Sequence, residues 1–544
     1  MAGVAVRRLK RLPVTLMIVG CLVWASGLVN VPQTVLAAPS RQPNQGEPSG
    51  ADFNGDGYAD LALSGSDDSG ASSRSPIRIL YGADDGLSSQ PQAFLLEDLV
   101  SPGQNDRGLW GGFGLGPLTS GDFDGDGFSD LAIGIPGLDV GSVPEAGGVL
   151  VIPGSDNGLD VGGRTLFTQA SPGIADGPEE EDGFGVSLAA ANLGHGLEDD
   201  LIVGVPAEDI PGSIYDGGQV HVLYGSPRGL NQTGSQVWRQ SSPGIEGRAG
   251  DSDNWGSQLV TGHFAGSPFA DLAVGNPGDH YHETSEHGAG TVQILYGSRD
   301  GLTAQASQRW SAESPALRSR GDVYGFPEAM AAADFDADGH DDLVLSSREG
   351  PGAGEAGSFT VLYGSESGLS ARRSQAWSQS SKGLAAVPAE SEAFGQALAT
   401  GNFGRDVGGR VFADLAVGVA ESSDKTEAGG VHIIFGGPWG LTGSNSEFWS
   451  ESTPGVRGVP EPGDYFGSRL ASGDFGRNPK TSADDLAVLV GGEVLDDTEL
   501  TGALVVLYGR SDGLTGQSSQ RWNPVDLGLP KDAYGWFPID ADTS

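Results

Sequence analysis

Short apolar runs, each bounded by Gly, Asp or Pro, recur along the whole chain. In one stretch they cover residues 113–119, 130–134 and 148–153 and the region around Phe167. Runs of this length between turn residues are typical of β-strands, because Val, Ile and Leu fit a pleated surface and Gly, Asp and Pro turn the chain. The pattern therefore predicts four short antiparallel strands in this stretch.

The same pattern returns seven times. Each copy combines an Asp-Phe-like pair, Asp-Leu-Ala-Val-Gly or a close variant, a strand-rich run, Gly-Leu and an aromatic residue. The Asp-Phe-like pair recurs every 68 to 72 residues, at Asp52, Asp122, Asn192, His263, Asp334, Asn402 and Asp474. A regular period of this size is typical of a propeller or a solenoid. Four strands per copy make one blade, so we expect an all-β, seven-bladed β-propeller of four-stranded antiparallel blades.

Two further positions recur once per copy. One is the Gly of the Gly-Leu pair, which we interpret as a turn that needs a positive φ: Gly86, Gly158, Gly229, Gly301, Gly368, Gly440 and Gly513. The other is the aromatic residue after it, which we expect to pack in the core between blades: Phe94, Phe167, Trp238, Trp310, Trp377, Trp449 and Trp522.

The two ends of the chain predict how the ring closes. Six copies carry an aromatic-Gly pair before the Asp-Phe position, but the first copy begins directly at Gly50. The C-terminus supplies such a pair at Tyr534-Gly535, after an acid at Asp532 as in other copies. Our hypothesis is that this C-terminal strand pairs into the first blade and closes the ring, which removes an open sheet edge.

Length and charge narrow the function. The 544 residues would by themselves suggest three or four domains, but the period makes them one propeller. The formal net charge of −42 excludes nucleic acid and anionic membrane surfaces as partners, because both attract a basic face. We expect a monomer that binds an extracellular protein or glycan.

The N-terminus has the features of an export signal. Basic residues without an acid precede an apolar run from Leu12 to about Val31, and small residues follow up to Ala38. We expect a signal peptide over 1–37, a linker over 38–50 and the propeller over 51–542, with the mature protein secreted or at the cell surface. An uncleaved anchor and lipidation at Cys21 are the alternatives. Cys21 is the only cysteine, so the mature chain has no disulfide.

The repeats resemble a known family. Phe113-Gly114 followed by Gly134-Ile135-Pro136, and Phe184-Gly185 followed by Gly204-Val205-Pro206, are similar to the FG-GAP repeats of integrin α-subunit propellers. The resemblance covers about residues 50 to 542 and implies a seven-bladed propeller with calcium loops in some blades. Copies five and six depart from the Gly-x-Pro half. Integrin ligand binding also needs a β subunit, which nothing in this chain resembles.

Three copies contain a dense carboxylate loop after the Asp-Phe position. Oxygen ligands at positions 1, 3 and 5, a backbone carbonyl at 7 and a carboxylate at 9 suit one hard cation, with Gly at 6 for the turn. The expected Ca²⁺ ligands are Asp52, Asn54, Asp56, Tyr58 and Asp60; Asp122, Asp124, Asp126, Phe128 and Asp130; and Asp334, Asp336, Asp338, His340 and Asp342. The other four loops lack these carboxylates or are lengthened, and we expect them to hold no metal.

Other motifs are weaker. The sequence from His282 to His287 narrowly misses H-E-x-x-H, and Arg320-Gly321-Asp322 matches an integrin-recognition tripeptide that the repeat itself largely explains. We found no Gly-x-Ser-x-Gly elbow and no catalytic pair. Acidic loops of variable length between the second and third strands, such as 145–148, 208–218 and 421–430, are the expected binding face.

These observations favour a calcium-stabilised extracellular binding or adhesion module without catalytic activity. A secreted hydrolase of the phospholipase or esterase kind, with its site on a propeller face, is one alternative, because FG-GAP repeats accompany a phospholipase domain in some families. A purely structural envelope protein is the other.

Overall fold

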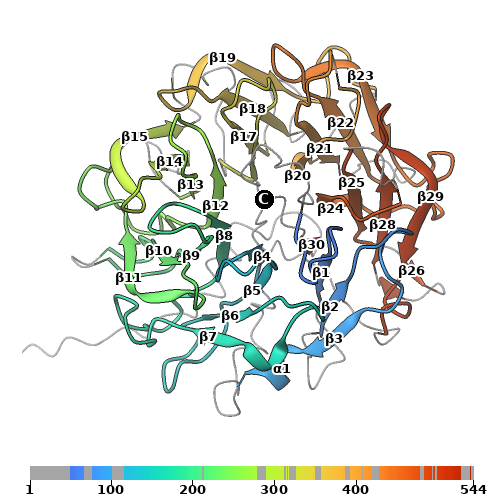
Figure 1. Ribbon diagram of the computed structural model, residues 1–544. Helices are drawn as coiled ribbons and strands as arrows, with labels where there is room; N and C mark the ends of the chain where they lie inside the picture. Colours follow the sequence, from blue (N-terminus) through green and yellow to red (C-terminus); the bar gives the residue numbers. More distant parts are fainter. Residues whose placement is uncertain are drawn as a thin grey trace, which may run out of the picture.

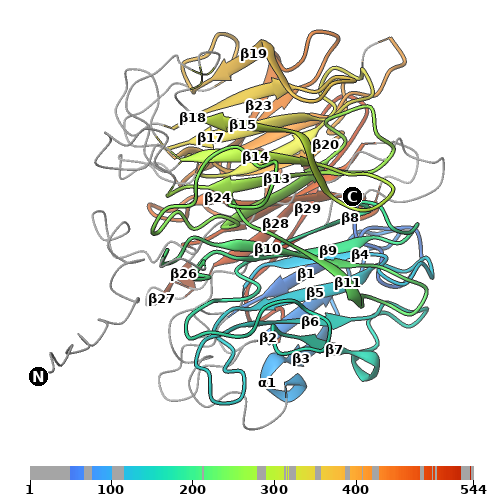
Figure 2. The same ribbon diagram turned by 90° about the vertical axis from the view of Figure 1, so that its left-hand side faces the viewer.

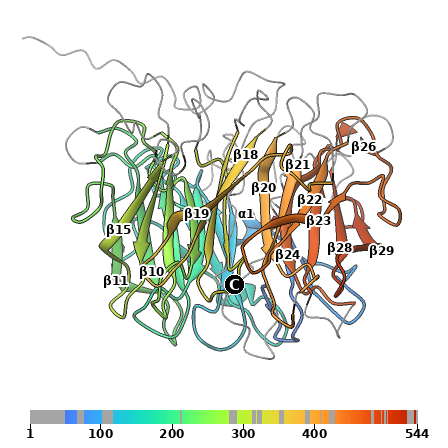
Figure 3. The same ribbon diagram turned by 90° about the horizontal axis from the view of Figure 1, so that it is seen from above.

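The computed structural model describes residues 50–65, 76–100, 116–210, 214–278, 290–311, 314, 317, 326–348, 357–385, 393–406, 408–419, 428–477, 483–492, 494–495, 499–500, 502–528 and 539–540. Seven four-stranded antiparallel sheets are arranged in a ring around a central axis (Figure 1). The strands run along this axis, so the connecting loops gather on two opposite faces (Figure 2, Figure 3). The predicted seven-bladed β-propeller is confirmed.

Strand bounds follow the repeat. Blade 1 has β1 (Leu61–Ser64), β2 (Pro76–Leu80) and β3 (Gln92–Leu95), with α1 (Leu96–Leu99) after them; blade 2 has β4 (Leu118–Gly121), β5 (Asp130–Ile135), β6 (Gly148–Ile152) and β7 (Thr165–Phe167), with a 3-10 turn (Val161–Gly163) before the last. Blade 3 has β8 (Ser187–Ala191), β9 (Asp200–Val205), β10 (Gln219–Tyr224) and β11 (Asn231–Trp238); blade 4 has β12 (Gln258–Gly262), β13 (Asp271–Asn276), β14 (Thr291–Tyr296) and β15 (Thr303–Ser311).

The remaining blades repeat this order. Blade 5 has β16 (Met330–Ala333), β17 (Asp342–Ser347), β18 (Ser358–Tyr363) and β19 (Ser370–Trp377); blade 6 has β20 (Phe394–Gly401), β21 (Asp414–Val419), β22 (Gly430–Phe435) and β23 (Thr442–Trp449). Blade 7 has β24 (Phe466–Gly473), β25 (Asp485–Val490), β28 (Ala503–Tyr508) and β29 (Thr515–Trp522), with a small hairpin of β26 (Val494–Leu495) and β27 (Glu499–Leu500).

The C-terminal strand completes blade 1. β30 (Ile539–Asp540) pairs antiparallel with β1, with Ala62 opposite Asp540 and Leu63 opposite Ile539, and it is the innermost strand of that sheet. Closure of the ring by the C-terminus is therefore confirmed. The aromatic-Gly pair at Tyr534, which suggested it, lies outside the described residues.

The hydrophobic core consists of seven clusters, one at each junction between neighbouring blades. The recurring aromatic residue contributes to it in every blade. Phe167, Trp377, Trp449 and Trp522 are buried, and Phe94, Trp238 and Trp310 are partly buried against the clusters. The expected place of these aromatics between blades is confirmed.

A tyrosine at the end of the third strand binds five of the blades to the next one. Tyr363 Oη donates to Gln375 Oε1 at 2.7 Å, Gln375 Nε2 donates to the Leu441 carbonyl of blade 6, and the Leu441 amide donates to Tyr363 Oη. Blades 1, 3, 4 and 7 pair a tyrosine and a glutamine in the same way, and Gln520 of blade 7 reaches the Leu87 carbonyl of blade 1.

These tyrosines add a second reason for the glycine of the Gly-Leu turn. All seven glycines have positive φ as predicted, but a Cβ on Gly440 would also lie 1.7 Å from Tyr363 Oη. Gly229 of blade 3 faces blade 2, where Pro153 replaces the tyrosine. A Cβ on Gly229 would meet nothing within 4 Å.

We expect Gly440→Ala to lower the free energy of unfolding by about 3 kcal/mol and Gly229→Ala by only about 1 kcal/mol. The φ values are similar, +92° and +84°, so the difference isolates the contact with the tyrosine. Denaturant unfolding of the two variants measures it. Equal losses would show that the tyrosine does not require a glycine at this turn.

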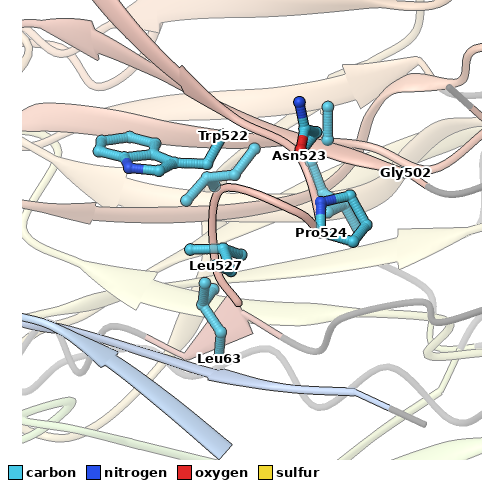
Figure 4. Close-up of a pocket in the computed structure, with 9 residues that line it drawn as sticks. Leu63, Gly502, Trp522, Asn523, Pro524 and Leu527 are labelled. Carbon is cyan, nitrogen blue, oxygen red and sulfur yellow. The ribbon is translucent and has the colours of Figure 1, made fainter. Parts of the chain in front are cut away.

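The junction between blades 7 and 1 is small and apolar. Leu63 of β1 lies next to Leu527 and Trp522 from the end of blade 7, around a cavity of about 10 Å³ (Figure 4). Arg78 of β2 donates from Nε to the Leu527 carbonyl at 2.8 Å. A cavity of this size holds roughly one water, so this junction joins the ends of the ring and offers no room for a ligand.

Candidate metal centres

The first residue of each acidic loop folds the loop around its own side chain. In blade 2, Asp122 Oδ1 accepts from the Asp126 amide at 3.0 Å and Oδ2 accepts from the Gly127 amide at 3.1 Å. Asp52 in blade 1 and Asp334 in blade 5 accept from the corresponding amides. The Gly at position 6 has φ near +90° in all three loops, as predicted. The three loops therefore share one backbone shape.

This shape brings the carboxylates together. Oxygens of Asp122, Asp124 and Asp126 lie within 4.8 Å of one another, and so do oxygens of Asp334, Asp336 and Asp338. The loop 52–60 has the same turn but carries Asn54 at position 3, which supplies an amide oxygen in place of a carboxylate. Clustered oxygen ligands of this kind fit Ca²⁺.

The electrostatics of the clusters favour a cation. Burial and the neighbouring charge of Asp126 raise the pKa of Asp124, and burial raises the pKa of Asp334 to about 6, against the opposing amide of Gly339. A raised carboxyl pKa means that the ionised form is disfavoured without a counter-charge. In addition, Asp336 Oδ1 is buried and has no hydrogen-bond partner. A hard cation would offset both costs.

The aspartate at position 9 accepts hydrogen bonds from two backbone amides of its own blade. In blade 2, Asp130 Oδ2 accepts from the Phe123 amide and Oδ1 accepts from the Gly154 amide at the end of the third strand. A corresponding pair of bonds recurs in all seven blades, although the first donor in blade 4 is Ala265, one residue later than in the others. We keep the name position 9 for this aspartate in the lengthened loops of blades 6 and 7. The seven residues are Asp60, Asp130, Asp200, Asp271, Asp342, Asp414 and Asp485. This aspartate thus ties the loop to the blade in every copy, including the four without the full carboxylate pattern.

Burial of this aspartate is deep enough to shift its titration. Burial raises the pKa of Asp130 and of Asp200 to about 8, and the two backbone amides on each carboxylate oppose the rise. Because Asp200 lies in a blade without the three-carboxylate pattern, the shift belongs to the fold and not to a metal centre. Ligation of calcium by Asp60, Asp130 and Asp342 stays a prediction.

Each loop is also bound to the next blade. The amide of the residue just before the position-9 aspartate donates to the carbonyl at position 1 of the preceding blade, as from Ser129 to Asp52 at 2.9 Å and from Asp199 to Asp122 at 3.0 Å. All seven junctions have this bond, with lengths from 2.6 to 3.2 Å, including Ala59 to Asp474 across the closure. The candidate centres therefore lie on a closed ring of inter-blade hydrogen bonds.

Positively charged side chains lie in two of the loops expected to hold no metal. Arg405 in blade 6 pairs with Glu447 at 2.8 Å, and its guanidinium lies 5.1 Å from the centre of the Phe435 ring. Arg477 in blade 7 lies 5.0 Å from the centre of the Tyr508 ring. These side chains are unsuited to holding a cation beside them.

A buried acid cluster between blades 2 and 3 was not expected from the sequence. Burial raises the pKa of Asp182 to about 7 and that of Glu208 to about 9, and Gln169 Nε2 donates to Glu208 Oε2 at 2.9 Å. Both carboxyls are about 1% exposed. Shifted acids of this kind often mark active sites, but a substrate cannot contact these two in the described conformation.

Three features predicted from the sequence have no described structure. The histidine-rich loop around His282, the Arg320-Gly321-Asp322 tripeptide and the whole export signal lie outside the described residues. Asn231 begins β11. Within the described residues, no helix has the length and apolar character needed to cross a bilayer.

The two blades that hold the three-aspartate clusters match a known repeat family. The profile of the FG-GAP repeat matches residues 118–152, which run from β4 to β6, and residues 326–362, which contain β16, β17 and most of β18. The chain contains FG-GAP repeats. Its ring is an integrin-α-like β-propeller, because integrin α-subunits are among its relatives.

The relatives of this FG-GAP protein include phosphatidylinositol-glycan-specific phospholipases D and integrin α-subunits. Phosphatidylinositol-glycan-specific phospholipase D of Rattus norvegicus is 33% identical over 181 residues, which are 33% of this chain and 20% of that protein. Integrin alpha-PS2 of Drosophila melanogaster is 32% identical over 197 residues, which are 35% of this chain and 12% of that protein. The chain thus spans a fifth or less of the length of either relative.

A solved structure, rhamnogalacturonan lyase YesW, aligns at 12% identity with a TM-score of 0.33, covering 77% of this chain and 64% of that one.

Proposed function

We propose that this FG-GAP propeller is an extracellular binding module of the adhesion type, stabilised by calcium and without catalytic activity of its own. The observation that carries the proposal is the pair of three-aspartate clusters, each on a loop that is hydrogen-bonded to the neighbouring blade. Calcium on such a loop would stiffen the ring while leaving the opposite face free for a ligand.

In this function, different loops would bind the calcium ions and the ligand. Asp122, Asp124 and Asp126 would hold one ion and Asp334, Asp336 and Asp338 a second, and the loop from Asp52 to Asp60 is the third proposed centre. A bound calcium ion supplies the positive charge that three adjacent carboxylates need. The loops between the second and third strands, on the opposite face, would contact a protein or glycan.

A binding screen tests this proposal. The chain from residue 38 is presented to immobilised glycans and matrix proteins, with calcium and with a chelator. We expect a ligand that is retained in calcium and weakened by chelation, and substitutions in the loop 206–218 should reduce its binding. The absence of any ligand in both conditions would contradict the binding function.

Hydrolysis of a glycosylphosphatidylinositol substrate is the second candidate, because several relatives bear the name phospholipase D. The alignment with phospholipase D covers 33% of the chain and that with integrin alpha-PS2 covers 35% at a similar identity, so these matches do not separate the two functions. Release of a lipid-anchored protein from vesicles by the purified chain, lost on chelation, would favour the hydrolase.

Calcium should also raise the stability of the chain. At a concentration 100-fold above the dissociation constant, each occupied centre adds about 2.7 kcal/mol to the free energy of unfolding. We expect Asp124→Asn combined with Asp126→Asn to remove about one such increment, measured as the change in melting temperature on adding calcium. The matched control is Asp300→Asn, an exposed acid in blade 4, which should leave the calcium response intact. Equal responses in the two variants would contradict a centre in blade 2.

A further inference from the structure

The blade 5 loop lies beside an arginine. Arg373 on β19 of the same blade has Nη2 at 2.5 Å from Asp336 Oδ2. The Asp336 side chain is 2% exposed, whereas that of Arg373 is 46% exposed. Within the described residues, no arginine or lysine pairs with the aspartates of the loops 52–60 and 122–130. The blade 5 loop thus differs from the other two in carrying its own counter-charge.

We propose that Arg373 guards the blade 5 centre: its guanidinium competes with calcium for Asp336, so that this centre binds calcium about tenfold more weakly than it would without the arginine. The proposal rests on the calcium function proposed above. It adds that the centres of one ring have different affinities, and it names the residue that sets the difference.

An unsatisfied oxygen indicates that the loop still has a place for a cation. Asp336 Oδ1 is buried without a hydrogen-bond partner, although Oδ2 is paired with Arg373. Oxygens of Asp334, Asp336 and Asp338 also lie within 4.8 Å of one another. Since a buried carboxylate oxygen without a donor is costly, the arginine satisfies only part of what the cluster requires, and calcium would satisfy the rest.

Further contacts hold Arg373 in this position. Its guanidinium lies 4.9 Å from the centre of the Tyr363 ring, whose hydroxyl donates to Gln375 two residues further along β19. A second arginine, Arg410 of blade 6, donates to the Ala337 carbonyl in the loop itself. Two guanidinium groups thus face the loop from two blades.

Simple electrostatics gives the size of the effect. A unit charge roughly 5 Å from a bound cation, in a partly exposed place with an effective dielectric between those of the protein surface and water, weakens binding by about tenfold or more. Calcium should therefore act in two steps. The blade 2 loop fills first, and the blade 5 loop fills at higher calcium as Arg373 leaves Asp336.

Calcium binding to the isolated blade 5 centre tests the proposal. In the full chain, Asp56→Lys and Asp126→Lys disable the other two loops at exposed positions, and isothermal titration calorimetry then measures calcium binding at blade 5. We expect Arg373→Gln to tighten binding about tenfold and to lower the melting temperature in chelator. The matched control is Arg372→Gln, which removes the same charge from the adjacent, exposed position of the same strand and should change the affinity far less.

The outcomes separate the two proposals. Equal affinities of the Arg373→Gln and Arg372→Gln variants, or weaker binding after Arg373→Gln, would overturn the proposed competition between Arg373 and calcium while leaving calcium binding itself in place. If neither these variants nor the unmodified chain bound calcium, both the proposed calcium function and the proposed role of Arg373 would be wrong. Circular dichroism of each variant confirms that the propeller is folded.

Discussion

Removal of residues 530–544 should lower the free energy of unfolding by about 5 kcal/mol, a fall of about 5 °C in melting temperature for a chain of this size. The truncation deletes β30, so blade 1 keeps three strands and β1 is left with an open edge. An unpaired inner edge exposes backbone amides and carbonyls and promotes association. Differential scanning calorimetry and light scattering measure the two effects.

The truncated chain should nevertheless fold. Arg78 still donates to the Leu527 carbonyl, and Gln520 still reaches the Leu87 carbonyl, so blades 7 and 1 stay joined. Removal of only 541–544, which leaves β30 in place, is the control and should not change the melting temperature. If the longer truncation were equally harmless, the pairing of β30 would not contribute to closure.

Asp414→Asn should cost about 4 kcal/mol, because it removes one of two acceptors at a fully buried position. Asp414 accepts from the Phe403 and Gly436 amides at 2.8 Å each, and in the variant the Nδ2 group would face one of these donors. Burial raises the pKa of Asp414 well above its usual range, which the two amides oppose. Denaturant unfolding at neutral pH measures the loss.

Asp406→Asn is the matched control for this substitution. Asp406 lies in the same loop but is exposed, and the Phe412 amide donates to it over a long distance of 3.4 Å. We expect a change below about 0.5 kcal/mol. A loss at Asp414 no larger than this would show that the aspartate at position 9 does not hold the loop to its blade.

The number of blades, their four strands and the closing C-terminal strand were predictable from the sequence, because a repeat of about 70 residues imposes them one copy at a time. The bounds were less accurate. The first strand of blade 2 was expected from residue 113; β4 begins at Leu118, and residues 113–115 lie outside the described residues. Gly116 and Pro117 are not part of β4, although the Gly116 amide donates to the Gly134 carbonyl of β5 and the Gly134 amide donates to the Pro117 carbonyl.

The two roles of the loop aspartates were only half predictable. The spacing within a loop indicates cation ligands, but the amides that Asp130 accepts include one from Gly154, at the far end of the third strand. The clue was present, since the aspartate at position 9 recurs in all seven copies, including those without the full carboxylate pattern. The pairing of Arg373 with Asp336 has no such clue, because it depends on side chains from two parts of one blade that do not recur elsewhere.

The separation of these roles bears on how such a ring changes over evolutionary time. The aspartate at position 9 maintains the blade, whereas positions 1, 3 and 5 serve the proposed ion. Substitutions at the latter positions remove a centre without removing a blade, as the loops of blades 3, 4, 6 and 7 illustrate. Calcium dependence can therefore be gained or lost blade by blade in propellers of this kind, while the architecture itself stays constant.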